Sequence, residues 1–225
     1  MTATETHLDF LISTLEAEYG RQTRYSTKNA MDQLIATILS QRTTYADEMT
    51  AYNNLLSTFG DWAGVGRADV AEIEACIQTS RYPEVKAPRI KAIINHIISE
   101  YGSADLDFLA DMPVEEARDL LMALPGVGHK TTTFVLLFTL RKPVLPVDTH
   151  VHRVSTRYGL IPMKMSQAKA HTALLEMLPK TADDLLNFHK LLFKHGQRVC
   201  TYSHPKCGGC AVRERCAYLS ERTNI

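Results

Sequence analysis

Apolar residues recur at intervals of three and four positions along most of the chain, the spacing of a buried stripe on an α-helix. Clear stripes lie within residues 31–39, 52–59, 90–101 and 114–124. The strict alternation of apolar and polar residues that marks a β-strand is almost absent. The pattern therefore predicts an all-α fold.

Short stretches rich in glycine and proline separate these predicted helices. They lie at residues 60–66, 82–84, 102–103 and 142–146. None is long enough to act as a flexible linker. Two later helices are predicted to begin after Ser166 and Thr181, because a hydroxyl is a good acceptor for the first amides of a helix.

One connection, Leu124-Pro-Gly-Val-Gly-His-Lys130, differs from the others because it joins two predicted helices through a glycine-rich turn. Glycine permits left-handed backbone and close approach by another molecule. Free N–H groups at a helix N-terminus bind phosphate oxygens. We therefore predict a helix-hairpin-helix motif that holds a nucleic-acid backbone through Gly126, Val127, Gly128 and His129, with His129 a backbone-side contact and not a catalyst.

The hairpin also brings an amine and a carboxylate toward one cleft. Lys130 lies in the first turn of the second helix, and Asp148 follows that helix after a proline turn. Neutral lysine is a nucleophile, but its reference pKa is about 10.4. The helix dipole and burial against Phe134 would have to lower that pKa by about three units, which needs roughly 4 kcal/mol. The alternative is an ordinary solvated lysine beside a glycine-rich helix cap.

Four of the five cysteines are crowded near the C-terminus with the spacing C-x6-C-x2-C-x5-C: Cys200, Cys207, Cys210 and Cys216. Four thiolates suit either tetrahedral zinc or a [4Fe–4S] cluster, and ligand count alone does not distinguish the two. Disulfides are not expected in a chain without a signal peptide. Cys76 is expected to be a buried core thiol and not a fifth ligand.

Charge is distributed unevenly although the net charge of the 225 residues is zero. Residues 1–125 hold 10 Lys and Arg against 19 Asp and Glu, whereas residues 126–216 hold 14 against 5. A basic segment that contains the hairpin favours a DNA-binding cleft. No apolar run is long enough to span a membrane, and the N-terminus lacks a signal-peptide pattern, so no membrane association and a cytoplasmic location are predicted.

Several of these motifs together resemble the endonuclease III family of the helix-hairpin-helix DNA glycosylase superfamily. They are Leu124–Lys130, Val147-Asp-Thr-His-Val-His-Arg-Val154, His195-Gly-Gln-Arg-Val-Cys200 and, more weakly, residues 30–44. The resemblance implies two helical domains that flank a DNA-binding cleft. One is a six-helix domain at residues 28–142, and the other combines residues 1–27 with 143–225 and carries a [4Fe–4S] cluster on the four cysteines.

The same resemblance implies a bifunctional DNA glycosylase and abasic-site lyase of base excision repair. Lys130 would be the Schiff-base nucleophile and Asp148 the essential carboxylate, and the strand would be cut by β-elimination. Oxidised pyrimidines are the expected substrates. The expected partner is double-stranded DNA with damaged bases or abasic sites, bound by a monomer associated with the nucleoid of a bacterial or archaeal cell.

Further DNA contacts follow from the resemblance. Relatives insert a polar side chain into the duplex from the loop at residues 40–44, so either Gln41 or Arg42 is the wedge. His150 either contacts DNA or caps the following helix, and Arg153 is expected to contact DNA. The loop at residues 201–206 is less basic than is typical of the family, so DNA contacts there are expected to be weaker or to move to Arg213 and Arg215. The adenine glycosylase branch carries a catalytic glutamate at the position that aligns with Thr37, and it usually has no lysine at the position of Lys130. Both differences exclude that branch.

Two other functions fit parts of the pattern. A DNA-binding module without catalysis would keep the hairpin and the cysteines, but it would need neither Lys130 nor Asp148. A monofunctional glycosylase would use Asp148 to activate water, and Lys130 argues against it.

Overall fold

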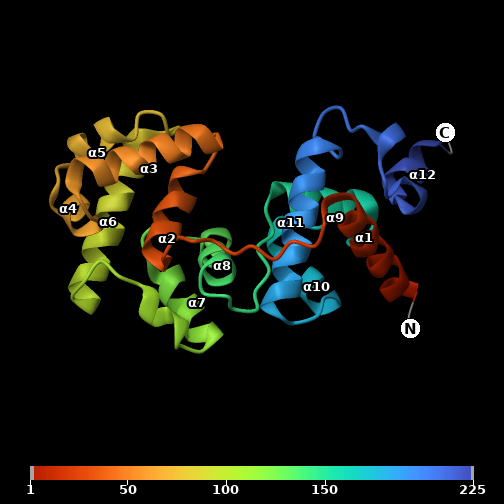
Figure 1. Cartoon of the computed structure of the whole chain (residues 1–225), viewed down its shortest axis with the longest axis horizontal. Helices are drawn as coiled ribbons and strands as arrows, with labels where there is room; N and C mark the ends of the chain where they lie inside the picture. Colours follow the sequence, from red (N-terminus) through yellow and green to blue (C-terminus); the bar gives the residue numbers. More distant parts are fainter. Residues whose placement is uncertain (1–2, 224–225) are drawn as a thin grey trace. The chain divides into compact units, whose positions relative to one another are not determined.

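The computed structural model describes the backbone of residues 3–223 and the side chains of residues 7–220. Over this range the chain forms twelve α-helices and three short 3-10 helices, and it contains no β-strand (Figure 1). The predicted all-α fold class is therefore confirmed. No helix within residues 3–223 is both long and apolar enough to cross a bilayer.

The helices form two compact units, Ser26–Lys142 and Met1–Tyr25 with Pro143–Ile225. We call these the hairpin unit and the cysteine unit. The division into domains at residues 28–142 and the remainder of the chain stays a prediction.

The hairpin unit contains seven α-helices and one 3-10 helix. Their bounds are α2 (Ala30–Leu39), α3 (Tyr45–Phe59), α4 (Trp62–Arg67), α5 (Val70–Cys76), α6 (Pro83–Tyr101), η1 (Asp107–Ala110), α7 (Val114–Ala123) and α8 (His129–Phe138).

Two helices organise the core of this unit. The long helix α6 packs against α4, α5 and α2, while α2 also packs against α3 and α8 (Figure 1). The apolar stripe predicted on α6 is completely buried at Ile90, Ile93, Ile94 and Ile97. The periodicity of the sequence thus identifies the buried face correctly.

The stretch at residues 60–66, which we expected to be only a break, contains all but the last residue of the short helix α4 (Trp62–Arg67). Asp61 starts it by accepting a hydrogen bond from the Gly64 amide at 2.6 Å. A Cβ on Gly66 would lie 2.8 Å from the Cγ2 of Ile94 on α6, so this glycine allows close packing of two helices. The unit accordingly has one α-helix more than the six expected.

The cysteine unit contains the remaining helices. Their bounds are α1 (Ala3–Tyr19), α9 (Thr149–Tyr158), α10 (Gln167–Met177), α11 (Ala182–Arg198), η2 (Cys207–Gly209), η3 (Arg213–Arg215) and α12 (Ala217–Thr223).

Helix α11 is the centre of this unit. It packs against α9 and α1, and α9 in turn carries α10 and α12 (Figure 1). The predicted helix starts are confirmed, since Ser166 accepts from the Lys169 amide and Thr181 from the Asp184 amide. The fully buried Phe188 of α11 lies at the core of the unit.

Candidate functional site

The turn between α7 and α8 is a tight hairpin. The Val127 amide donates to the Leu124 carbonyl at 3.1 Å. Gly126 has φ +69°, a left-handed conformation, and a Cβ there would lie 2.5 Å from the Nε of Arg89. Gly128 has φ −109°, and a Cβ there would meet nothing within 4 Å. The fold therefore requires a glycine at 126, whereas Gly128 leaves the surface of the turn open.

The N-terminus of α8 carries Lys130. Gly128 is the N-cap and has no side chain, so the first amides of α8 lack a side-chain cap. Such an end carries partial positive charge and attracts anions. Desolvation and the Arg118 guanidinium lower the pKa of His129 below its usual value.

Lys130 itself is exposed, so the expected burial of this side chain is wrong. Its Nζ lies 5.6 Å from the centroid of the Phe134 ring. The ring supplies a cation–π contact but leaves the amine accessible, because residues 128–130 project from the core at the start of α8.

The predicted wedge loop follows α2 and has a strained conformation. Arg42 is exposed and has φ 57°, which is unusual for a residue other than glycine. Lys86 on α6 is only 3% exposed, and its amine lies beneath the loop surface, where it binds the loop backbone. Its Nζ donates to the carbonyls of Leu39 and Gln41, each at 2.8 Å, and to the Ser80 hydroxyl at 2.8 Å.

Burial lowers the pKa of Lys86 to about 8, an effect that Arg89 reinforces and Glu48 opposes. Lys86 is thus an ammonium with three N–H donors at neutral pH. The role of Lys86 in holding this loop was not predicted from the sequence. The available signal was a lysine on the same helical face as the buried Ile90 and Ile94.

A groove lies between the wedge loop and the start of α6. It is lined by Gln41, Arg42, Tyr82, Val85, Lys86 and Arg89. Arg42 donates to the Tyr82 hydroxyl at 3.4 Å. Arg89 lies in the groove and also against Gly126 of the hairpin. The structure therefore brings these two predicted DNA-contact regions together on one unit.

Asp148 lies in the other unit, as the N-cap of α9. It is buried, with 4% of its surface exposed. One carboxylate oxygen, Oδ1, accepts from the amides of His150 and Val151, both at 2.8 Å. Among the described residues, Oδ2 receives no hydrogen bond, so one oxygen caps the helix and the second remains available for chemistry.

Arg153 and His150 form a pair on α9. The Nη2 of Arg153 lies 3.0 Å from the Nδ1 of His150, and it also donates to the Gly196 carbonyl at 2.8 Å. Because arginine only donates, Nδ1 of His150 is the acceptor in this pair. The Nε of Arg153 donates to the Cys200 carbonyl at 2.8 Å. Arg153 is thus engaged inside the unit, and a DNA contact by either residue stays a prediction.

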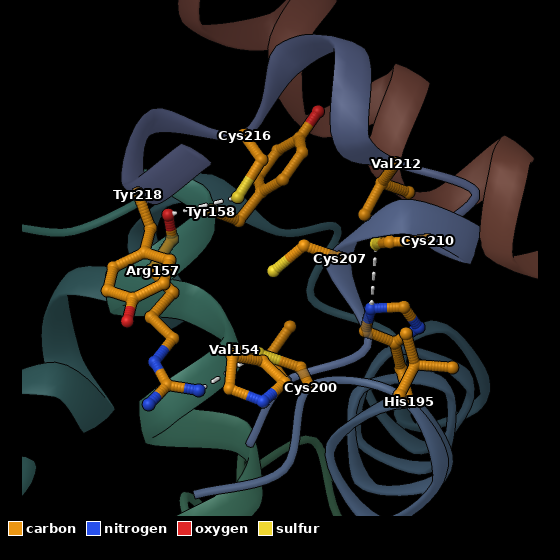
Figure 2. Close-up of a pocket in the computed structure, with 12 residues that line it drawn as sticks. Val154, Arg157, Tyr158, His195, Cys200, Cys207, Cys210, Val212, Cys216 and Tyr218 are labelled. Carbon is orange, nitrogen blue, oxygen red and sulfur yellow. Dashed lines mark hydrogen bonds between the residues drawn. The ribbon is translucent and has the colours of Figure 1, made fainter. Parts of the chain in front are cut away.

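The four predicted cysteine ligands line one cavity of the cysteine unit, with about 370 Å³ of empty space including its open side (Figure 2). The cavity lies between α9, the end of α11 and the segment that follows it.

Cys76 lies in the hairpin unit, far along the chain from the other four cysteines. Its thiol is half-buried and contacts the Thr58 hydroxyl at 3.6 Å, so the expected full burial of Cys76 is wrong.

Side chains around this cavity contact the cysteine sulfurs directly (Figure 2). The Nη1 of Arg157 donates to the Cys200 Sγ at 3.6 Å, and the Nε2 of His195 lies 3.5 Å from the Cys210 Sγ. The Tyr19 hydroxyl contacts the Nδ1 of His195 at 3.2 Å. Burial lowers the pKa of His195 to about 4, so its ring is neutral at physiological pH.

The cysteine sulfurs also influence one another. Burial raises the pKa of the Cys210 and Cys216 thiols, and the negative charges of Cys200 and Cys207 add to this effect. A polynuclear cation would remove that repulsion. As the side chains stand, no three or more His, Cys, Asp or Glu side chains among the described residues are arranged to hold a metal ion. The fit therefore rests on donor chemistry and enclosure: four thiols around one cavity, with an N–H of Arg157 directed at the Cys200 sulfur and a ring nitrogen of His195 beside the Cys210 sulfur.

A family model describes residues 35–180 as an HhH-GPD superfamily base excision DNA repair protein. The chain is 32% identical over 196 residues to an endonuclease III from Sulfolobus acidocaldarius, and the match covers 85% of this chain and 83% of that protein. It is 31% identical over 175 residues to protein ROS1C from Oryza sativa subsp. japonica. That match covers 71% of this chain but only 9% of the rice protein.

Similarity in three dimensions extends over the whole chain. A solved structure of a non-covalent endonuclease III–DNA complex superposes with a TM-score of 0.84 and 23% sequence identity, covering 100% of both chains. At this level of identity the match shows a shared fold.

Proposed function

Because this chain belongs to the endonuclease III family of helix-hairpin-helix base excision DNA repair proteins, we propose that it is a DNA glycosylase with abasic-site lyase activity. The observation that carries the proposal is the exposed Lys130 amine in the first turn of α8, beside amides that lack a side-chain cap. A phosphate held by these amides would bring the adjacent sugar close to the amine.

DNA binding precedes the chemistry. The hairpin residues Gly126, Val127, Gly128 and His129 hold one phosphate through the backbone, and the wedge loop with Gln41 and Arg42 fills the space that a flipped nucleotide leaves. Flipping costs a few kcal/mol, and damaged bases that stack poorly reduce this cost. Arg89, in contact with both regions, couples the position of the hairpin to that of the loop.

The exposed Lys130 first gives up one proton to water, and its neutral amine then attacks C1′ of the flipped nucleotide. The C1′–N bond breaks, and the base leaves with the bonding electron pair and acquires a proton. Asp148 stabilises the positive charge that develops on the sugar, for which its Oδ2 is available. After the sugar ring opens, the product is an imine between Lys130 and C1′.

The imine acidifies the C2′ proton. Removal of that proton expels the 3′ phosphate by β-elimination, which cuts the strand. Water then hydrolyses the imine and returns the free amine of Lys130. The reaction needs no oxidant, reductant or diffusible cofactor, since each bond that breaks is matched by a proton transfer or by addition of water.

We further propose that Cys200, Cys207, Cys210 and Cys216 hold a [4Fe–4S] cluster. Such a cluster, when bound, cross-links the segment after α11, which is too short to form a core of its own. Arg157 and His195 would then donate hydrogen bonds to ligand sulfurs. Zinc on the same four thiolates is the alternative.

Substrate class is tested by matched assays on duplexes that each carry one lesion. The panel contains oxidised pyrimidines, oxidised purines, alkylated purines and deaminated bases, together with a preformed abasic site. Base release and strand cleavage are measured on the same samples. We expect both activities on oxidised pyrimidines, and strand cleavage alone on the abasic duplex. Base release without any cleavage would favour a monofunctional glycosylase that uses Asp148-activated water, and no activity on any duplex would favour a DNA-binding module.

A further inference from the structure

The segment immediately before Asp148 is buried but forms neither helix nor strand. Residues 144–147 have no regular secondary structure, and Leu145 and Val147 are 2% and 0% exposed. A buried backbone outside regular structure must find hydrogen-bond donors for its carbonyls elsewhere. Three successive carbonyls of this segment therefore depend on side chains.

Each of the three carbonyls receives a separate side-chain donor. The Nδ1 of His171 lies 2.9 Å from the Leu145 carbonyl. The Nδ1 of His189 lies 2.8 Å from the Pro146 carbonyl. The Nε2 of Gln167 donates to the Val147 carbonyl at 2.5 Å. Gln167 and His171 come from α10 and His189 comes from α11, so two helices hold the segment.

The chemistry of these contacts fixes the state of both histidines. A carbonyl oxygen only accepts, so Nδ1 of each ring must carry a proton. His171 and His189 are 8% and 2% exposed, which keeps water from replacing them. Each ring is therefore the donor to its carbonyl through Nδ1–H.

The three contacts from Gln167, His171 and His189, which we call the carbonyl clamp, lie directly before the Asp148 carboxylate in the chain. Val147 is the residue before Asp148, and the Oδ1 of Asp148 accepts hydrogen bonds from the amides of His150 and Val151, which follow it in the chain. The backbone on both sides of Asp148 is thus constrained. Helix α11 supports both sides, since the His189 ring stacks on Phe193 with centroids 6.1 Å apart, and Phe193 meets the His150 ring edge-on at 5.1 Å.

We propose that Gln167, His171 and His189 are positioning residues that hold the Asp148 carboxylate in its reactive orientation. The proposal rests on the function assigned to Asp148 above. A purely structural role would predict that loss of a donor lowers stability only. A positioning role predicts that loss of a donor also slows base release in protein that is fully folded, because small displacements of a catalytic group have large kinetic effects.

His189 offers a matched pair of variants. His189→Asn places an amide N–H near the position of Nδ1–H, whereas His189→Leu removes the donor and retains similar bulk. In single-turnover assays on folded protein, we expect His189→Leu to slow base release by roughly 10- to 100-fold. We expect His189→Asn to recover most of that rate. Affinity for duplex DNA with an abasic-site analogue should be the same for both variants, because the hairpin belongs to the other unit.

A double-mutant cycle separates positioning from general damage. If His189 acts through Asp148, His189→Leu should slow base release little further in an Asp148→Asn background. Full additivity of the two losses would overturn the proposal, as would equal rates for the Leu and Asn variants. If His189→Leu does not fold, Gln167→Met removes a donor from the first position of α10 at nearly constant volume and is held to the same criteria.

Amide hydrogen exchange provides a readout that does not depend on activity. The His150 and Val151 amides report directly on the Asp148 Oδ1 cap. We expect their exchange to accelerate about tenfold or more in His189→Leu but not in His189→Asn. Unchanged protection in the Leu variant would overturn the clamp. A wild-type protein that releases no base would refute the proposed function. The exchange measurement would still test whether His189 holds the Asp148 cap in place.

Discussion

Asp148 divides two tasks between its two oxygens. Oδ1 caps α9 through two backbone amides, whereas Oδ2 receives no hydrogen bond from the described part of the chain. An asparagine at this position can still accept hydrogen bonds at Oδ1 and is as good an N-cap as aspartate. Substitution by asparagine therefore removes the negative charge while the helix start is preserved.

We expect Asp148→Asn to slow base release by roughly 100-fold or more, because the amide supplies no negative charge to the developing cation. Cleavage at a preformed abasic site should be less affected, since no base leaves there. Both steps are measured under single-turnover conditions. Asp148→Ala serves as the control for the cap and should lower the free energy of unfolding by about 1 kcal/mol relative to Asp148→Asn. An Asn variant with wild-type base release would refute the assigned role.

Sequence motifs placed Lys130 correctly in the first turn of α8, because a helix start is marked by local features such as glycine and proline. They placed Asp148 only after a proline turn, and its position as the N-cap of α9 was not predicted. The environments of these residues were less accessible. Lys130 is exposed and not buried against Phe134, and Lys86, His171 and His189 were not singled out. Their roles depend on carbonyls 20 or more positions away, and no local pattern encodes such a contact.

At the scale of elements, the hairpin uses its two glycines for different purposes. Gly126 has a left-handed conformation and touches Arg89, whereas Gly128 has an ordinary conformation and an open surface. The first glycine serves the fold, and the second serves the approach of another molecule. A pair of alanine substitutions separates the two roles.

We expect Gly126→Ala to lower the free energy of unfolding by about 2 kcal/mol, through backbone strain and contact with Arg89. Gly128→Ala should change it by no more than about 0.5 kcal/mol. The same Gly128→Ala variant should bind abasic-site DNA about tenfold more weakly, since a methyl group prevents close approach of a phosphate to the amides. Urea unfolding and a binding titration test both variants. Tight DNA binding by Gly128→Ala would contradict the assignment of the hairpin.

The loop after α2 is a second element held by one side chain. The pKa of Lys86 is lowered to about 8 from 10.5, so between these values the folded state binds fewer protons than the unfolded state. The stability contributed by this group is therefore lowest below pH 8 and increases as the pH rises toward 10.5.

We expect the free energy of unfolding of the wild type, relative to that of Lys86→Met, to increase by about 2 kcal/mol between roughly pH 7.5 and roughly pH 9.5. Taking the difference between the two proteins removes the titration of the other groups. Urea unfolding at the two pH values measures it. A difference that is constant or that decreases over this range would show that the ammonium is not disfavoured at this site.

At the scale of the whole molecule, periodicity predicted the all-α fold because most helices bury one clear stripe. It missed α4, whose Gly66 allows a close contact with α6 that only the folded chain reveals. The charge asymmetry along the sequence is also weaker between the two units. The hairpin unit holds 11 Lys and Arg against 15 Asp and Glu, and the cysteine unit holds 14 against 10. The basic segment 126–216 begins in one unit and continues in the other.

The stability of the cysteine unit is expected to depend on the metal group that its four thiols bind. We expect purified protein to be brown and to contain about four iron atoms per chain, because four thiolates around one cavity suit a [4Fe–4S] cluster. Elemental analysis after anaerobic purification measures the metal. Cys210→Ser should lose most of the iron and lower the stability of the unit. One zinc and no iron per chain would contradict the cluster.

The proposed function requires that Lys130 forms a covalent bond to the sugar. Reduction with borohydride in the presence of abasic-site DNA tests this most directly, with the modified residue identified by mass spectrometry. We predict a trapped complex at Lys130, and no trapping or strand cleavage by Lys130→Gln, which should still bind the DNA through its hairpin amides. Wild-type protein that releases a damaged base but is never trapped, or that is trapped only at another lysine, would contradict the account.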